Sequence, residues 1–307
     1  MLAPLKPCSR SIRIGIHSTF ILKSSGVAVS YLQRIQACNH CSLDGLIPFV
    51  IEGQRYGFVS ADFAAALGDY PDVFNVEPRS VALVDSLATP ESRTRAVAEV
   101  NERLRRSGAI RQWNDELFDV KNDFNDPAVM AIERGAVIHY GLRAYGVHVN
   151  GLVEKADGSW LWVATRARDK PTFPGMLDHI VAGGQPAGLG LLENVIKEAE
   201  EEASIPAELA ARARQTSRVT YCLRTDKGLK ADTLFCFDLE LPPDFTPRGN
   251  DGEVESFELL PLSRVAEIVR DTERFKPNCN LVIIDLLLRK GMIDDKTLAS
   301  ALRASLP

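Results

Sequence analysis

The sequence lacks the features of a membrane protein, a nucleic-acid-binding protein and a disulfide-stapled protein. No apolar run approaches the roughly 18 residues that span a bilayer, and the nearest, residues 281–288, is interrupted by Asp285. The net charge is −5, so the chain has no excess of the Lys and Arg that nucleic acids and anionic membranes attract. Six cysteines in 307 residues are too sparse for a disulfide scaffold. We therefore expect a cytoplasmic, reduced protein with neither a nucleic-acid nor a membrane partner.

Acidic residues are missing from the amino end. Residues 1–42 contain no Asp or Glu, but they contain five Lys and Arg residues. This composition is typical of organelle transit peptides, and a disordered tail or a misassigned start codon would give the same pattern. We favour a tail over residues 1–29, and organelle targeting stays open as the alternative.

The first half of the chain predicts a small α+β domain over residues 30–140. Residues 29–38 have a helical pattern, and residues 48–51 and 56–59 are typical of a hairpin with Gly at its turn. Thr89-Pro90-Glu91 is a helix start and predicts a helix to about residue 107. Asp126-Pro127 predicts a second such helix over residues 128–134. This half shows no pattern typical of catalysis.

The second half predicts a mixed sheet with helices packed on its faces. Residues 145–153 and 159–165 are strand-like and are joined by a turn containing Asp157-Gly158. The further elements predicted are strands at residues 218–223, 233–241 and 254–260 and helices at residues 189–203, 262–273 and 281–289. The predicted domain spans residues 141–293, and residues 294–307 are expected to form a tail.

The helix at residues 189–203 carries an unusual set of carboxylates. With Leu191 set at 0° and about 100° per residue, Leu192, Val195, Ile196, Ala199 and Ala203 form one apolar stripe. On the same scale Glu198, Glu202 and Glu201 lie along the edge of that stripe, whereas Glu200 points to solvent. Like charges at this spacing repel, and they also oppose the negative end of the helix dipole. A divalent cation such as Mg²⁺ or Mn²⁺ would offset both costs; an ordinary solvated acidic run is the competing interpretation.

The residues around this helix resemble the Nudix box. Counted from Gly183 in Gly183-Gly184-Gln185-Pro186-Ala187-Gly188, the spacing fits the family pattern without a gap. Glu198, Glu201 and Glu202 then fall on the metal-binding glutamates of the family, and Ile205 falls on the closing aliphatic residue. The resemblance implies an α/β/α sandwich and a metal-dependent hydrolase that cleaves the P–O–P bond of a small organic diphosphate.

Four positions depart from the pattern. Leu189 stands where the family has its first Glu, Lys197 replaces Arg, Ala199 is small for its position, and Ser204 replaces Gly. Ser204 is unfavourable if its backbone needs a positive φ. None of the four changes removes a metal-binding carboxylate.

A narrower resemblance covers about residues 32–293. Segments such as Pro174-Gly175-Met176-Leu177-Asp178, Asp251-Gly252-Glu253-Val254-Glu255 and Phe275-Lys276-Pro277-Asn278 are similar to a Nudix subfamily with an extra amino-terminal domain. That subfamily includes plant and fungal proteins, some fused to thiamine pyrophosphokinase. The resemblance implies hydrolysis of thiamine diphosphate or its oxidised analogues to the monophosphate.

The expected chemistry is attack by water on one phosphorus, with Mg²⁺ or Mn²⁺ lowering the pKa of the water. Glu198, Glu201 and Glu202 are the expected ligands, and either Glu202 or Glu198 is expected to accept the proton. Glu253 and Glu255 are candidates for an additional acid. Three cations at the end of the strand before the box are expected to bind the diphosphate, because alternate residues of a strand share one face. They are Arg166, Arg168 and, as the first choice, Lys170.

Three other features are interpreted as structural. Cys38 and Cys41 form a CxxC without a second half, so we expect thiols at a helix end and not a zinc site. His139 and His148 lie in apolar surroundings and are interpreted as core residues.

Two other functions stay open: a Nudix hydrolase acting on a nucleoside diphosphate derivative, and a diphosphate-binding module without activity. A homodimer also stays open.

Overall fold

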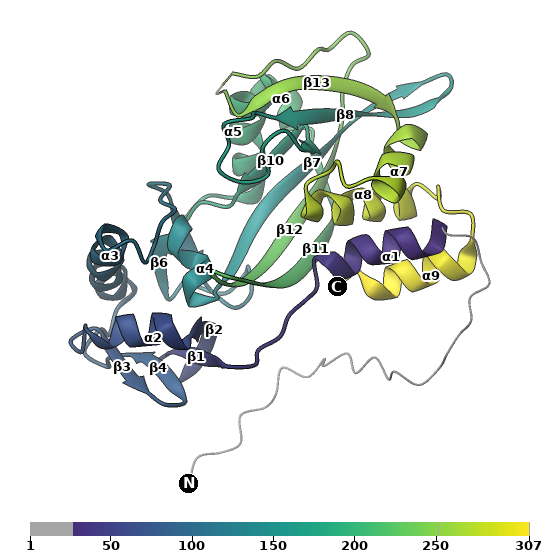
Figure 1. Cartoon of the computed structure of the whole chain (residues 1–307). Coiled ribbons are helices and arrows are strands. Elements are labelled where there is room, and N and C mark those ends of the chain that lie inside the picture. The colour runs from purple at the N-terminus through teal and green to yellow at the C-terminus, as the bar shows by residue number, and fades with distance from the viewer. Residues whose placement is uncertain (1–26, 251, 307) are drawn as a thin grey trace.

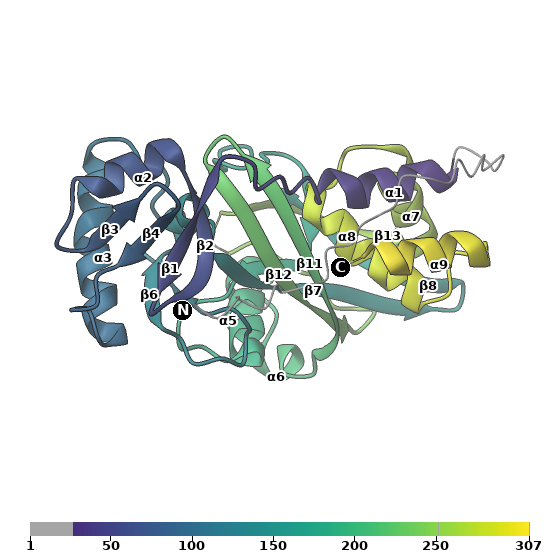
Figure 2. The ribbon, with the colours of Figure 1, turned by 90° about the horizontal axis from the view of Figure 1, so that it is seen from below.

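The computed structural model describes residues 27–250 and 252–306. These residues form two lobes, which lie side by side in Figures 1 and 2. The N-terminal lobe contains β1 (Leu46–Ile51), β2 (Gln54–Ser60), α2 (Ala61–Gly68), β3 (Phe74–Glu77), β4 (Ser80–Leu83), α3 (Pro90–Arg106), β5 (Leu117–Val120), β6 (Met130–Glu133), a short 3₁₀ turn (Arg134–Ala136) and α4 (Val137–Tyr140).

The C-terminal lobe is larger and holds a mixed sheet. Its elements are α1 (Val27–Ala37), β7 (Arg143–Lys155), β8 (Gly158–Arg166), β9 (Leu177–His179), β10 (Val181–Gly184), α5 (Leu191–Ala203), α6 (Ala207–Ala210), β11 (Arg214–Thr225), β12 (Gly228–Glu240), β13 (Val254–Pro261), α7 (Leu262–Asp271), α8 (Pro277–Arg289) and α9 (Lys296–Ser305). The predicted α+β class is confirmed.

The N-terminal lobe is built as its turn and cap residues predict. β1 and β2 form the predicted hairpin, in which Glu52 and Gly53 take the left-handed backbone that its tight turn requires. Thr89 and Ser92 cap α3 reciprocally, each side chain bonding the backbone of the other. A separate apolar core fills this lobe, with Phe49 against the ring of Tyr140 at its centre.

The helix predicted over residues 128–134 is wrong. Residues Met130–Glu133 form β6, which pairs antiparallel with β5. Met130 and Ile132 are buried and Ala131 between them is only half-buried, which is the period of two of a strand. The pairing with β5 outweighs the helical propensity of Ala, Met and Glu.

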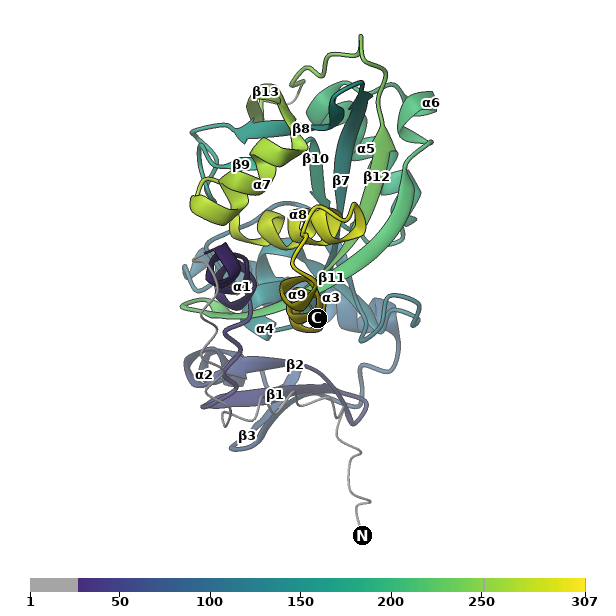
Figure 3. The ribbon, with the colours of Figure 1, turned by 90° about the vertical axis from the view of Figure 1, so that its right-hand side faces the viewer.

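The central sheet of the C-terminal lobe has the strand order β11-β12-β7-β8-β13, with β12 and β7 parallel. β7 is long enough to pair with β10 in its first half and with β8 in its second half. α5 covers one face of the sheet, and α7 and α8 cover the other (Figure 3). Val147 and Val149 of β7 therefore pack toward α5, while His148 between them faces α8.

The two ends of the described chain meet on the C-terminal lobe. α1 packs against α7, α8 and α9 although residues 46–140 follow it in the other lobe (Figure 1). The Tyr31 hydroxyl donates to the Ala266 carbonyl at 3.1 Å. The segment expected to be a tail after residue 293 contains α9, whose Leu302 is fully buried. Residues 1–26, which include most of the expected amino-terminal tail, lie outside the described residues.

One disulfide links the connector after α1 to the central sheet. Cys41 is bonded to Cys222 of β11, so the expectation of reduced thiols is wrong for this pair. Among the described cysteines, Cys38, Cys236 and Cys279 are free and buried. Cys38 is thus a buried thiol near the end of α1, as expected, whereas Cys41 is not a thiol.

Residues 27–250 and 252–306 contain no helix that is both long enough and apolar enough to cross a membrane.

Candidate functional site

The candidate site is built on α5 and on the β10 strand beneath it. α5 begins after Gly190, whose N–H is bonded by the Glu193 carboxylate at 2.9 Å. Val195, Ala199 and Ala203 are fully buried against the sheet, which confirms most of the apolar stripe. Leu192, placed on the stripe by the same angular count, is 40% exposed instead. The Asn194 side chain, which lies on another side of the helix, is buried and donates to the Gly184 carbonyl at 2.8 Å, which links the start of the helix to β10.

Glu202 is the carboxylate most deeply engaged with the sheet. The Ala182 N–H of β10 donates to its Oε2 at 2.8 Å. Burial raises the pKa of Glu202 well above its usual range, and the nearby carboxylates Glu198 and Asp178 act in the same direction, against the hydrogen bond from Ala182. A carboxylate held in this way is costly to ionise until a cation or a proton compensates it.

Glu198 lies one helical turn before Glu202 and packs directly on Gly183. A Cβ atom at position 183 would overlap the Glu198 carboxyl group, so any residue other than Gly would displace this side chain. Its side chain is 13% exposed, and burial raises its pKa.

Glu201 and Glu198 share one cation. The Lys197 ammonium lies 2.7 Å from Glu201 Oε2 and 3.2 Å from Glu198 Oε1. Lys197 thus reduces the repulsion between these two carboxylates, while Glu202 has no such partner on the helix.

These glutamates fit a hard divalent cation. Mg²⁺ and Mn²⁺ take oxygen ligands from carboxylates. A cation beside Glu198 and Glu202 would act against the burial that raises the pKa of both. The missing Cβ of Gly183 leaves the space that the Glu198 carboxyl group fills. In the structure Glu201 turns to Lys197 and Glu202 to Ala182, so ion binding would exchange these contacts.

Ser204 ends α5 in the left-handed conformation, with φ at 52°. The Gly-to-Ser departure therefore does fall where Gly is preferred. The Ser204 hydroxyl offsets part of the cost by donating to the Arg248 carbonyl at 2.9 Å.

The cations expected to bind the diphosphate are all paired within the protein. Arg166 is 14% exposed; it donates to Asp178 Oδ2 at 2.9 Å and to the carbonyls of Thr172 and Phe173. It therefore anchors the loop between β8 and β9. Lys170 lies 2.5 Å from Glu253.

Arg168 is 82% exposed and lies 3.3 Å from Glu255. The expected cations Arg168 and Lys170 thus pair with the two expected additional acids, in the loops that leave β8 and enter β13. A diphosphate could recruit these cations only by displacing Glu255 and Glu253.

The N-terminal lobe contacts the loop that precedes α5. The Ala187 N–H donates to the Leu117 carbonyl of β5 at 2.7 Å. Phe118 of β5 packs on Gly184, and the Arg134 guanidinium lies over the Phe118 ring at 5.5 Å. Arg134 pairs with Glu116 at 2.9 Å, and Glu116 contributes to raising the pKa of Glu198. This contact was not predictable from the sequence, because it depends on the packing of two lobes.

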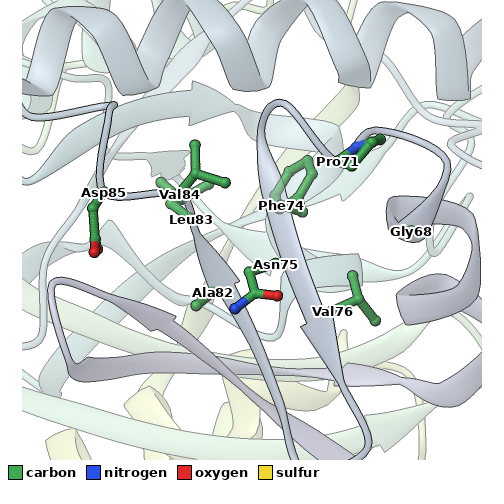
Figure 4. Close-up of a pocket in the computed structure, with 9 residues that line it drawn as sticks. All are labelled: Gly68, Pro71, Phe74, Asn75, Val76, Ala82, Leu83, Val84 and Asp85. Carbon is green, nitrogen blue, oxygen red and sulfur yellow. The ribbon is translucent and has the colours of Figure 1, made fainter.

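A cavity of about 650 Å³ lies elsewhere, in the N-terminal lobe (Figure 4). Asp85 is the single ionisable residue lining it, and Phe74, Val76 and Leu83 are among the others. With no cation in its wall, this cavity does not suit a diphosphate.

Asp178 and Lys276 form a partly buried contact with a structural role. Asp178 of β9 is buried and accepts bonds from Arg166 and from Lys276 at 3.0 Å. Lys276 precedes α8, so this carboxylate fixes the start of that helix to the sheet. Adjacent Asp and His in a short apolar strand were the available signal, because such residues are rarely buried without partners.

A mixed sheet flanked by helices, with glutamates on one helix edge beside a Gly-Gly strand, is the architecture of a Nudix domain. Comparisons with known proteins agree. The NUDIX domain model matches residues 144–279, and a model described as a domain of unknown function (DUF4743) matches residues 30–144. The protein named Nudix hydrolase 24, chloroplastic, from Arabidopsis thaliana is 44% identical over 89% of this chain and 76% of its own length.

Nudix hydrolase 20, chloroplastic, from the same plant is 43% identical over 88% of this chain and 75% of its own length. The chain therefore belongs to the Nudix hydrolase family, and it is a hydrolase. Members of this family generally act on pyrophosphate bonds and use divalent metal ions. Among solved structures, DR0079 from Deinococcus radiodurans is similar over 54% of this chain and 97% of its own, with 23% identity and a TM-score of 0.41; this match adds nothing about the substrate.

Proposed function

We propose that this enzyme hydrolyses the P–O–P bond of a small organic diphosphate and releases the monophosphate. The substrate class we favour is thiamine diphosphate or its oxidised analogues. The main support for this reaction is the position of two carboxylates beside β10. Glu202 is half-buried and accepts a hydrogen bond from the Ala182 N–H, and Glu198 lies one helical turn away on Gly183.

Glu198, Glu201 and Glu202 would hold Mg²⁺ or Mn²⁺. The ion would lower the pKa of water, orient the diphosphate and offset charge on the leaving oxygen. Glu202 is the proton acceptor in this proposal, because its pKa is raised toward the range in which a general base works. Glu198 and Glu201 would supply negative charge for the cation, and they would exchange their contacts with Lys197 for contacts with the ion.

The loop cations would hold the other end of the substrate. Arg168 and Lys170 have flexible side chains that could exchange their carboxylate partners for phosphate oxygens. The cost is small for Arg168, since exposed ion pairs contribute little. It is larger for Lys170, whose side chain is 20% exposed. Arg166 is too deeply bonded to Asp178 to move in this way. Its proposed role is to shape the loop that presents Lys170.

The test compares Glu202→Gln with Glu200→Gln. Both changes remove one charge from α5, but Glu200 is exposed and points away from the sheet. Purified proteins are incubated with Mg²⁺ or Mn²⁺ and a panel of thiamine diphosphate, its oxidised analogues, ADP-ribose and NADH, and monophosphate and free phosphate are measured. We expect Glu202→Gln to lower kcat by about 10²–10⁴-fold and Glu200→Gln to leave it unchanged.

The outcomes separate the competing functions. Turnover only of ADP-ribose or NADH would replace the thiamine substrate with a nucleoside diphosphate derivative. Tight binding without metal-dependent turnover of any compound would show a binding module. Equal loss in both variants would remove Glu202 from its assigned role.

Residence in an organelle is a further part of the proposal. It is supported by the acid-free first 42 residues and by the two similar plant proteins, which are named as chloroplastic. Imaging the full chain and a chain without residues 1–29, each fused to a fluorescent protein, tests it. Identical diffuse cytoplasmic signals would reject it.

A further inference from the structure

A cluster of four ligand-type side chains is buried on the face of the sheet opposite α5. His148 comes from β7, Asp178 and His179 from β9, and Cys279 from α8. One ligand atom from each residue lies within 4.8 Å of all the others, and each residue is at most 4% exposed. Within residues 27–250 and 252–306 this is the one group of three or more His, Cys, Asp or Glu that converges in this way. None of its members belongs to the glutamate set of α5.

The spacing of these atoms suits a small tetrahedral ion. The Nδ1 atoms of His148 and His179 are 3.0 Å apart, and Cys279 Sγ is 2.8 Å from Asp178 Oδ1. Zinc binds nitrogen at about 2.0–2.1 Å, so a tetrahedral ion places two nitrogen ligands about 3.3 Å apart. Small outward movements of the four side chains would therefore open the coordination sphere.

The histidines are in the protonation state that binds metals. Burial lowers the pKa of His148 well below its usual value and that of His179 to about 4, so both rings are neutral at pH 7. Two Nδ1 atoms in contact can share only one proton. The Nε2 of His179 is also buried, and it has no hydrogen-bond partner among the described residues. Leaving such a group unsatisfied is unfavourable, so this corner of the core is incomplete as a hydrogen-bond network.

Asp178 divides its two oxygens between different partners. Arg166 and Lys276 both bind Oδ2, whereas Oδ1 accepts from the Cys279 thiol and from the His179 N–H at 2.9 Å. Ion binding would replace the thiol proton, which passes to solvent, and would leave both ion pairs on Oδ2 in place. The thiolate then supplies a second negative charge near the half-buried cations Arg166 and Lys276. Imidazole and thiolate ligands select a transition ion such as Zn²⁺ over Mg²⁺.

We propose that His148, Asp178, His179 and Cys279 bind one Zn²⁺ ion. With four protein ligands the site is closed, which is typical of structural zinc and leaves no position for a substrate. The ion ties α8 to β7 and β9, the strands that lead into the candidate active site. This proposal is independent of the proposed hydrolysis and stands or falls by metal binding alone.

The test measures metal content and a cobalt spectrum on the full chain. Wild-type protein is stripped of metal, reloaded with Zn²⁺ or Co²⁺, dialysed and analysed for metal per chain. We expect one equivalent of Zn²⁺ and, with Co²⁺, a thiolate-to-cobalt charge-transfer band. Cys279→Ser should lose the band and bind Zn²⁺ at least about 100-fold more weakly, since even changes to residues behind the ligands cost 10–100-fold.

Cys236→Ser is the matched control, because Cys236 is also a free, buried cysteine but lies outside the cluster. It should retain both the metal and the band. Wild-type protein without stoichiometric Zn²⁺ and without the cobalt band would overturn the proposal, as would equal binding by Cys279→Ser. If Cys279→Ser does not fold, the wild-type cobalt spectrum decides alone, because a site containing Cys279 must show the thiolate band. Hydrolysis lost in Glu202→Gln with zinc retained would confirm that the two sites are separate.

Discussion

Loss of the Cys41–Cys222 disulfide should destabilise the protein strongly. The bond closes a loop with a sequence separation of 181 residues, which runs through the whole N-terminal lobe and α5. In the chain-entropy treatment a loop of this length lowers the entropy of the unfolded chain by about 18 cal/mol/K, or about 5 kcal/mol at 25 °C. We therefore expect Cys41→Ser to lower the free energy of unfolding by up to about 5 kcal/mol.

The assay is urea unfolding followed by tryptophan fluorescence, with and without a phosphine reductant. The oxidised wild-type protein should have the highest midpoint, and the reduced wild type should coincide with Cys41→Ser. The corresponding thermal shift is on the order of 10 °C. Cys38→Ser is the control, because Cys38 is close in sequence but has no disulfide. Coincidence of the oxidised and reduced wild-type curves would refute the reasoning.

Three other changes test the candidate site. The acid limb of the pH profile of kcat/KM should lie above the ordinary carboxylate range, because the pKa of Glu202 is raised. This limb should move to lower pH as the Mg²⁺ concentration increases, since a nearby cation favours the ionised form. pH profiles at two Mg²⁺ concentrations measure the shift, and a limb that stays at the same pH would contradict it. Gly183→Ala should push Glu198 aside, so the Mg²⁺ concentration that gives half-maximal activity should rise by about 10–100-fold. Rates measured against Mg²⁺ concentration test this, and an unchanged activation curve would show that Glu198 is not a ligand. Ser204→Ala keeps the positive φ but loses the hydrogen bond to Arg248, so the free energy of unfolding in urea should fall by about 1 kcal/mol. Ser204→Gly loses the same bond but also removes about 1 kcal/mol of backbone strain, so its free energy of unfolding should be nearly unchanged. Equal stability of the Ala and Gly variants would exclude this account.

The elements with a local signal were predictable from the sequence. α3 begins at the Thr89 cap and ends before Gly108, as its capping residues indicate, and the strands of the central sheet follow their apolar patterns. The edge position of Glu198 and Glu202 followed from the helical period alone. The family assignment came from the spacing of the glutamates, and it is confirmed by the relatives.

The remaining features depend on contacts between distant segments. Residues 128–134 have good helix formers, and only the neighbouring β5 makes them a strand. His148 was expected to be an ordinary core residue because β7 is apolar around it, and its neighbours Asp178 and Cys279 are far away in the sequence. The ion pairs of Lys170 and Arg168 likewise depend on β13 lying beside β8. A single sequence carries no direct signal for such pairings.

The path of α1 limits how this protein can be divided. A chain that started at residue 141 would contain every strand of the central sheet but would lack the helix that covers α7, α8 and α9. Tyr31 and Ile35 of α1 are 5% and 2% exposed, and without them the apolar surfaces of α7, α8 and α9 that they cover would be open to solvent. Exposed patches of this kind favour aggregation. To produce the C-terminal lobe alone, residues 27–37 would therefore have to stay attached to it, for example through a linker that replaces the N-terminal lobe.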